Sequence, residues 1–174
     1  LIGEKATSID TTTKTIVGSK GTQIPYDACV LATGSFPFVP PIPGKQRPGV
    51  FVYRTIEDLE DMLAYVDEHN VKSAAVIGGG LLGLEAAKAA QDMGLTSHII
   101  EFADILMCRQ IDQGGHSALV EKIEAMGLQV HCGARTESFV GEDGTFNDHE
   151  STSPVAALRF SNEGWDDLPV QMVI

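Results

Sequence analysis

Four glycines and one carboxylate are the residues of this chain whose types and spacing point most directly to chemistry. The run Gly78-Gly79-Gly80-Leu81-Leu82-Gly83 has the form GxGxxG, and Glu101 follows 18 residues after its last glycine. In dinucleotide-binding domains an acidic residue follows the glycines by about 20 residues. The motif alone is weak evidence, because glycine-rich chains produce it by chance, so its flanking elements decide its meaning.

The flanking sequence places the glycines between a strand and a helix. Residues 73–77 are a short apolar run that predicts a strand, and residues 81–93 are rich in alanine and predict a helix. Residues 97–100 are a second apolar run, which ends at Glu101. This order brings the glycine loop and the carboxylate to the same edge of a parallel sheet.

Each position of the motif has a physical role in a dinucleotide site. Gly78 permits the tight turn, Gly80 leaves room for a pyrophosphate, and Gly83 allows the helix to pack closely on the strand. The helix N-terminus offers free amides and partial positive charge to the phosphates. Glu101 can accept hydrogen bonds from an adenosine ribose and would repel a 2′-phosphate, which predicts NADH rather than NADPH.

Other interpretations of the loop remain open. A glycine turn in a ligand-free α/β domain and the nucleotide loop of a methyltransferase have the same elements. FAD uses the same fingerprint, but 77 residues precede this one, which favours a second nucleotide domain. Glu85, expected in the first turn of the helix, either lies beside the ligand or offsets the helix dipole.

The rest of the chain predicts a β-rich segment followed by an α/β domain. Residues 5–31 predict short strands, the last of them over 26–31, and five prolines within 36–49 predict an extended connector. We therefore expect a first domain over residues 1–49 and a second over 50–174. The second has the order βαβαβ, typical of a Rossmann-like parallel sheet.

Further elements of the second domain follow from periodicity. Thr55 predicts a helix start and Asn70 its end, with a buried face that recurs at helical spacing. A second helix is expected over 118–126 and a third parallel strand over 128–131. Antiparallel strands are expected at 138–140, 155–160 and 168–174, with a polar loop over 141–154. We expect the buried face of the first helix to consist of Ile56, Leu59, Leu63 and Val66.

Composition excludes several classes of protein. The chain has 174 residues and a formal net charge of −12, which argues against a nucleic-acid or anionic-membrane surface. It has no apolar run near the roughly 20 residues of a membrane span. Its three cysteines are scattered, which predicts no metal site and fits a reducing, cytoplasmic compartment. Because it begins with Leu1 and ends on an apolar run, we expect a fragment.

Residues 26–37, which contain Ala32-Thr33-Gly34, resemble the segment that leaves the FAD domain in two-dinucleotide flavoproteins, the pyridine nucleotide–disulfide reductase superfamily. A narrower resemblance is to the flavin portion of the large subunits of NAD(P)H-dependent nitrite reductases. It is carried by residues 36–44, 52–59, 78–87, 100–103 and 106–115, and the stretch Leu106-Met107-Cys108-Arg109-Gln110-Ile111-Asp112 discriminates best.

This resemblance implies roles for particular residues. Ala32, Thr33 and Gly34 would line an FAD site, and residues 78–83 would hold the NADH pyrophosphate, with Glu101 on its ribose. Leu81 would gate the nicotinamide, and Glu85 would lie near its carboxamide.

The implied reaction is hydride transfer from NADH to FAD, in which the cofactors carry the chemistry, so no catalytic acid, base or nucleophile is expected. The partners would be the remaining FAD and redox domains of the same polypeptide, and sirohaem and a 4Fe-4S cluster would lie only there. Two alternatives stay open: an FAD-dependent NADH reductase of the rubredoxin or ferredoxin type, and a non-catalytic nucleotide-binding module.

Overall fold

The computed structural model describes residues 1–146 and 152–174. By its internal contacts the chain divides into two compact units, Leu1–Phe36 and Pro37–Ile174. The expected domain boundary between residues 49 and 50 stays a prediction; within the connector, Ile42 packs against the core of the second unit. The expected polar loop over 141–154 lies partly outside the described residues.

The first unit is a small antiparallel sheet. Its strands are β1 (Ala6–Asp10), β2 (Thr15–Gly18) and β3 (Gln23–Pro25), paired in that order. The strand expected over residues 26–31 is wrong. Val30 and Leu31 are 86% and 73% exposed and lie outside any strand, so their apolar character is not used for burial within this unit.

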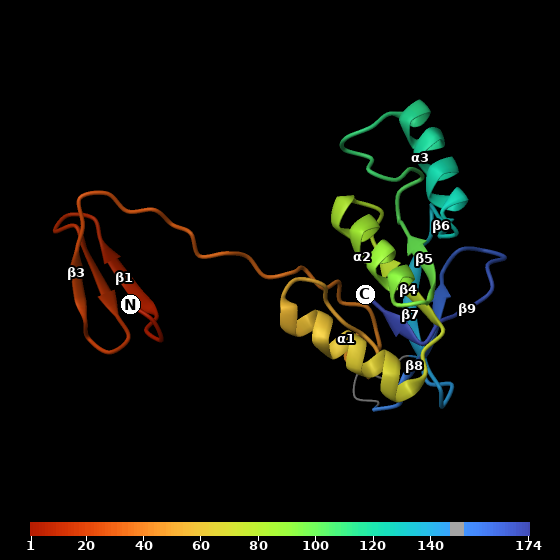
Figure 1. Cartoon of the computed structure of the whole chain (residues 1–174), viewed down its shortest axis with the longest axis horizontal. Helices are drawn as coiled ribbons and strands as arrows, with labels where there is room; N and C mark the ends of the chain where they lie inside the picture. The colour runs from red at the N-terminus through yellow and green to blue at the C-terminus, as the bar shows by residue number, and fades with distance from the viewer. Residues whose placement is uncertain (147–151) are drawn as a thin grey trace. The chain divides into compact units, whose positions relative to one another are not determined.

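The second unit contains the expected alternation of parallel strands and helices, labelled in Figure 1. Its central sheet has the order β10-β4-β5-β6, and all its pairings are parallel. The Rossmann-like fold is therefore confirmed. The elements of this part are α1 (Ile56–His69), β4 (Ser73–Ile77), α2 (Leu81–Asp92), β5 (Thr96–Ile100), α3 (Gln113–Ala125), β6 (Gln129–His131) and β10 (Met172–Val173).

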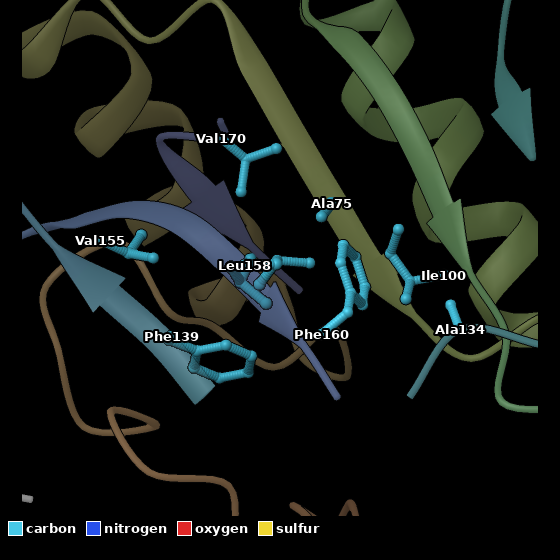
Figure 2. Close-up of a cluster of buried hydrophobic side chains, with 9 residues drawn as sticks. Ala75, Ile100, Ala134, Phe139, Val155, Leu158, Phe160 and Val170 are labelled. Atoms are coloured by element: carbon cyan, nitrogen blue, oxygen red, sulfur yellow. The ribbon is translucent and has the colours of Figure 1, made fainter. Parts of the chain in front are cut away.

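A second antiparallel sheet covers one face of the parallel sheet. Its strands are β7 (Thr136–Gly141), β8 (Val155–Phe160) and β9 (Leu168–Pro169). Figure 2 shows Phe139, Leu158 and Phe160 of this sheet packed in one cluster with Ala75 and Ile100 of the parallel strands. The expectation of antiparallel pairing through residue 174 is wrong, because β10 leaves β9 and pairs with β4 in parallel.

Helices cover the opposite face of the parallel sheet. Side chains alternate along a strand, so Val76 and Ile99 point to α2 and α3, whereas the neighbouring Ala75 and Ile100 point to the antiparallel sheet. The result is a three-layer domain of helices, parallel sheet and antiparallel sheet. Residues of β4 and β5 are therefore buried on both faces of the sheet, as expected for parallel strands covered on both sides.

Helix α1 begins and ends where the sequence predicts. Thr55 and Asp58 form a capping box, in which each side chain accepts from the other residue's backbone amide, and Asn70 ends the helix in the left-handed conformation. The predicted buried face is partly wrong. Met62 is fully buried, whereas Ile56 and Leu63 are 74% and 45% exposed, so the face that packs is rotated from the predicted one.

Candidate functional site

The glycine loop leaves the end of β4 and enters α2 in a conformation that requires its glycines. Gly78 has φ 120°, a region that side chains disfavour. A β-carbon at Gly83 would lie 1.9 Å from the carbonyl oxygen of Gly78, whereas one at Gly80 would meet no atom within 4 Å. The three positions thus have the roles of turn, free space and close packing that the motif predicts.

The start of α2 is open to a ligand. Gly80 is the N-cap residue and supplies no side chain to bond the first amides of the helix. The first helical turn contains no acidic residue that would offset the helix dipole. Unpaired amides and a partial positive charge at this end are the features that bind phosphate groups.

The carboxylate of Glu101 faces this loop. Its Oε2 accepts a hydrogen bond from the backbone N–H of Gly79 at 2.6 Å, and its Oε1 accepts one from Ala103 at 2.7 Å. An ionised carboxylate has about four acceptor positions, so both oxygens keep capacity for the hydroxyls of a ribose. The loop and the acid predicted from their spacing are therefore brought together in one place.

The geometry changes the interpretation of the exposed residues that follow the loop. Because α2 begins at Leu81, Glu85 lies in its second turn rather than in the first turn where it was expected. Leu81 and Leu82 are 58% and 65% exposed on the first turn. These three side chains are available to a ligand, and their roles toward nicotinamide stay predictions.

An apolar groove of about 300 Å³ lies beside the loop. Leu82 and Gly83 line it at the start of α2, together with Ile77 and Ile174 at the ends of β4 and β10. Phe38 in the connector and Tyr53, shortly before α1, also line the groove. The groove and Glu101 therefore lie on opposite sides of β4, over its two neighbours in the sheet.

The residues expected at the FAD site lie in the last part of the first unit, after its sheet. Ala32, Thr33 and Gly34 are all exposed and lie outside any helix or strand, and Gly34 has φ 72°. Their expected role toward FAD therefore stays a prediction.

Two histidine contacts were not predicted by residue types or spacing. His116 Nδ1 accepts a hydrogen bond from the backbone N–H of Leu106 at 3.1 Å. His98 Nδ1 and His131 Nε2 lie 3.2 Å apart on adjacent strands. Burial lowers the pKa of both His98 and His131, and the charge of His131 lowers the pKa of His98 further. No sequence signal distinguished these histidines, because each contact joins elements whose pairing only the fold determines.

Two other kinds of feature are absent from the part of the chain that the structure describes. Within residues 1–146 and 152–174, no cluster of three or more His, Cys, Asp and Glu side chains could hold a metal ion. In the same part of the chain no helix combines the length and apolarity that crossing a membrane requires.

The fold and the loop define a dinucleotide-binding α/β domain. Residues 1–164 match the family model described as pyridine nucleotide-disulphide oxidoreductase, and the chain belongs to that family. It is 46% identical over 142 residues to the nitrite reductase (NADH) large subunit of Escherichia coli, and 41% identical over 140 residues to the nitrite reductase [NAD(P)H] of Bacillus subtilis.

These matches cover most of this chain and little of the relatives. They span 82% and 80% of the chain, but only 16% and 17% of the two relatives. Among solved structures, the ferredoxin reductase for the CYP199A2 system from Rhodopseudomonas palustris superposes with a TM-score of 0.79 at 26% identity. That match covers 99% of this chain and 40% of the other.

Proposed function

We propose that this chain is the NADH-binding part of a flavoprotein oxidoreductase that passes a hydride from NADH to FAD. The observation that carries the proposal is the placement of Glu101 against the glycine loop, because its oxygens and the open amides of α2 are complementary to a ribose and a pyrophosphate. Family membership supports the flavin as the acceptor.

The order of the strands supports one orientation for the dinucleotide. Glu101 follows β5 on one side of β4, and the apolar groove lies over β10 on the other side. A ligand whose pyrophosphate rests at Gly80 would direct its adenosine to Glu101 and its nicotinamide toward the groove. Ligands of open α/β sheets bind at the carboxyl ends of the strands, where the connections diverge to opposite sides.

In this orientation the chain binds and positions its ligand, and supplies no proton. Nicotinamide and flavin carry the hydride chemistry when bound. Gly80 leaves space for the phosphates, Glu101 fixes the ribose, and Leu82 with Ile174 would exclude water from one side of the nicotinamide ring. Leu81 and Glu85 are exposed on the first two turns of α2. In the proposed orientation Leu81 would gate the nicotinamide, and Glu85 would bind its carboxamide.

For the terminal reaction we favour nitrite reduction to ammonia, since nitrite reductases are the relatives with 46% and 41% identity. Sirohaem and an iron–sulfur cluster would then belong to other domains of the same polypeptide. A reductase that serves ferredoxin is the second candidate, favoured by the structural match to a ferredoxin reductase.

The test has two stages. Calorimetric titration of the chain with NADH and NADPH should show binding with preference for NADH, and absence of both would reject the proposal. In the complete protein, anaerobic addition of NADH should bleach the flavin absorbance, and added nitrite should restore it. Restoration by oxidised ferredoxin but not by nitrite would favour the second candidate, and a colourless protein would indicate a nucleotide-binding module.

A further inference from the structure

Residues 101–107, at and after the end of β5, contact the glycine loop. Leu106 is fully buried, and its Cδ2 lies 2.5 Å from where a β-carbon of Gly79 would stand. The N–H of Met107 donates a hydrogen bond to the carbonyl oxygen of Gly79 at 2.9 Å. Since Glu101 accepts from the N–H of Gly79, both backbone polar groups of this glycine are fixed by the same segment.

This segment has a conformation that other contacts must maintain. Met107 has φ 49°, in the left-handed region that residues with a β-carbon rarely adopt. Backbone hydrogen bonds from Gln110 and Ile111 to the carbonyl of Met107 close a single turn after it. That turn is short, and a single turn has little stability of its own.

His116 provides an anchor for the segment on α3. It lies in the first turn of that helix, and its Nδ1 accepts the backbone N–H of Leu106. The start of α3 is itself fixed, because the Asp112 side chain accepts from the N–H of Gly115 at 2.9 Å. Accepting at Nδ1 requires a ring that carries its proton on Nε2.

We propose that His116 is a positioning residue of the dinucleotide site, which acts through Leu106 and Met107 on Gly79. The inference rests on the proposed function, since it assumes that the glycine loop receives a dinucleotide. Without the acceptor at Nδ1, the N–H of Leu106 loses its partner, and the turn at Met107 is held less firmly. Gly79 then loses the donor to its carbonyl, and the amides that receive the pyrophosphate are less ordered before binding.

Two amide side chains separate this role from simple packing. In His116→Asn the side-chain oxygen can occupy the place of Nδ1, whereas in His116→Gln the amide reaches the place of Nε2. Both variants are polar, uncharged and smaller than histidine, so they form a matched pair. His116→Leu removes the acceptor and keeps much of the volume.

The experiment measures two properties of the 174-residue chain for each variant. Calorimetry gives the dissociation constant for NADH. Limited digestion with trypsin, read by mass spectrometry, gives the rate of cleavage after Arg109, which is exposed within the segment. We expect His116→Asn to remain within about 2-fold of wild type in both, and His116→Gln and His116→Leu to bind NADH about 5- to 10-fold more weakly, as expected for one lost hydrogen bond. Both should also be cleaved faster after Arg109.

Equal behaviour of the asparagine and glutamine variants would overturn the proposal, whether both resemble wild type or both are impaired. Thermal unfolding identifies a variant that fails to fold, and the comparison then rests on His116→Asn against wild type. If the wild-type chain binds no NADH, the proposed function fails and the positioning role fails with it. The trypsin rates, which need no ligand, would still show whether His116 holds the segment.

Discussion

Gly83 packs against Gly78 so closely that a β-carbon at residue 83 would lie 1.9 Å from the carbonyl oxygen of residue 78. The oxygen belongs to the backbone at the turn between β4 and α2, and a backbone atom cannot move aside as a side chain can. Helix α2 therefore approaches the strand only because residue 83 has no side chain. This contact sets the distance between the start of α2 and the end of β4.

Gly83→Ala should consequently destabilise the fold by about 1–3 kcal/mol, the usual cost of overpacking, despite the better helix propensity of alanine. Gly114→Ala is the matched control, because its β-carbon would meet only Asp112 Oδ1 at 3.5 Å in the first turn of α3. That variant should be neutral or more stable by up to about 1 kcal/mol. Urea denaturation of both measures the difference, and equal stabilities would contradict the packing argument.

Gly80→Val tests the opposite property of the same loop. A β-carbon at Gly80 meets nothing within 4 Å, and φ −83° is accessible to any residue, so the fold should be retained. The valine would occupy the place expected for the pyrophosphate, and the affinity for NADH should fall by at least about 100-fold.

The control for this variant is Gly114→Val, the same substitution at the start of another helix. It should leave NADH affinity unchanged. Calorimetric titration gives both affinities, and circular dichroism verifies folding. Tight NADH binding by Gly80→Val would show that the pyrophosphate does not lie on this glycine.

Glu101 has a structural and a predicted recognition role, and two variants separate them. Glu101→Gln keeps one carbonyl oxygen for the two backbone donors, Gly79 and Ala103, and should cost about 1–2 kcal/mol of stability. Glu101→Arg removes both acceptors and the negative charge, so it should destabilise more and shift preference toward NADPH. The ratio of the NADH and NADPH dissociation constants is the measurement, and an unchanged ratio in the arginine variant would exclude Glu101 as the residue that reads the ribose.

Arg47 joins the connector to the β7–β8 hairpin. It is 2% exposed, and its guanidinium donates to the carbonyl oxygens of Phe139, Thr145 and Ser153 at 3.1, 2.9 and 3.1 Å. Asp143 lies 3.9 Å from it. Arg47→Met would remove these hydrogen bonds, which the guanidinium makes from a buried position, and should cost about 3 kcal/mol.

Guanidinium chloride denaturation of Arg47→Met measures that loss. Arg159→Met, which removes the solvent-screened ion pair with Asp167, is the control and should reduce stability much less. Similar losses in the two variants would show that burial of Arg47 adds nothing to its effect.

The sequence predicted the geometry of the glycine loop better than the packing around it. The glycines and Glu101 were recognisable because the dinucleotide motif is local, and backbone geometry at Gly78 and Gly83 imposes the residue type. The parallel pairing of β10 was missed, because an apolar run of a few residues has no feature that distinguishes parallel from antiparallel partners.

Two side-chain contacts between segments were also missed, for a related reason. His116 contacts Leu106 across a turn, and Arg47 contacts residues about 100 positions away. Neither contact leaves a periodic pattern in the sequence. In the first unit, the apolar run ending at Leu31 predicts a strand, but Val30 and Leu31 are exposed and lie outside any strand. The hydrophobicity of these side chains does not specify whether they pack against another surface.

The histidine pair of the central sheet predicts a dependence of stability on pH. His98 is 6% exposed, and its Nδ1 lies 3.2 Å from Nε2 of His131, where one ring must donate and the other accept. Burial lowers the pKa of both rings below the usual value of about 6.5. The unfolded chain therefore binds protons that the folded chain does not, in the pH range from about 6.5 downward to the lowered values.

The contribution of the two neutral rings to the free energy of unfolding should be complete above pH about 6.5. As the pH falls below this value, the free energy of unfolding should decrease by at most about 1.4 kcal/mol per pH unit for each proton. His131→Gln keeps a polar group near Nε2 and removes one titrating ring, so its stability should fall less steeply over the same range. Urea denaturation at several pH values between about 5 and 7.5 gives both slopes. Since every other titrating group is common to the two proteins, parallel slopes would show that the pair does not carry the acid sensitivity.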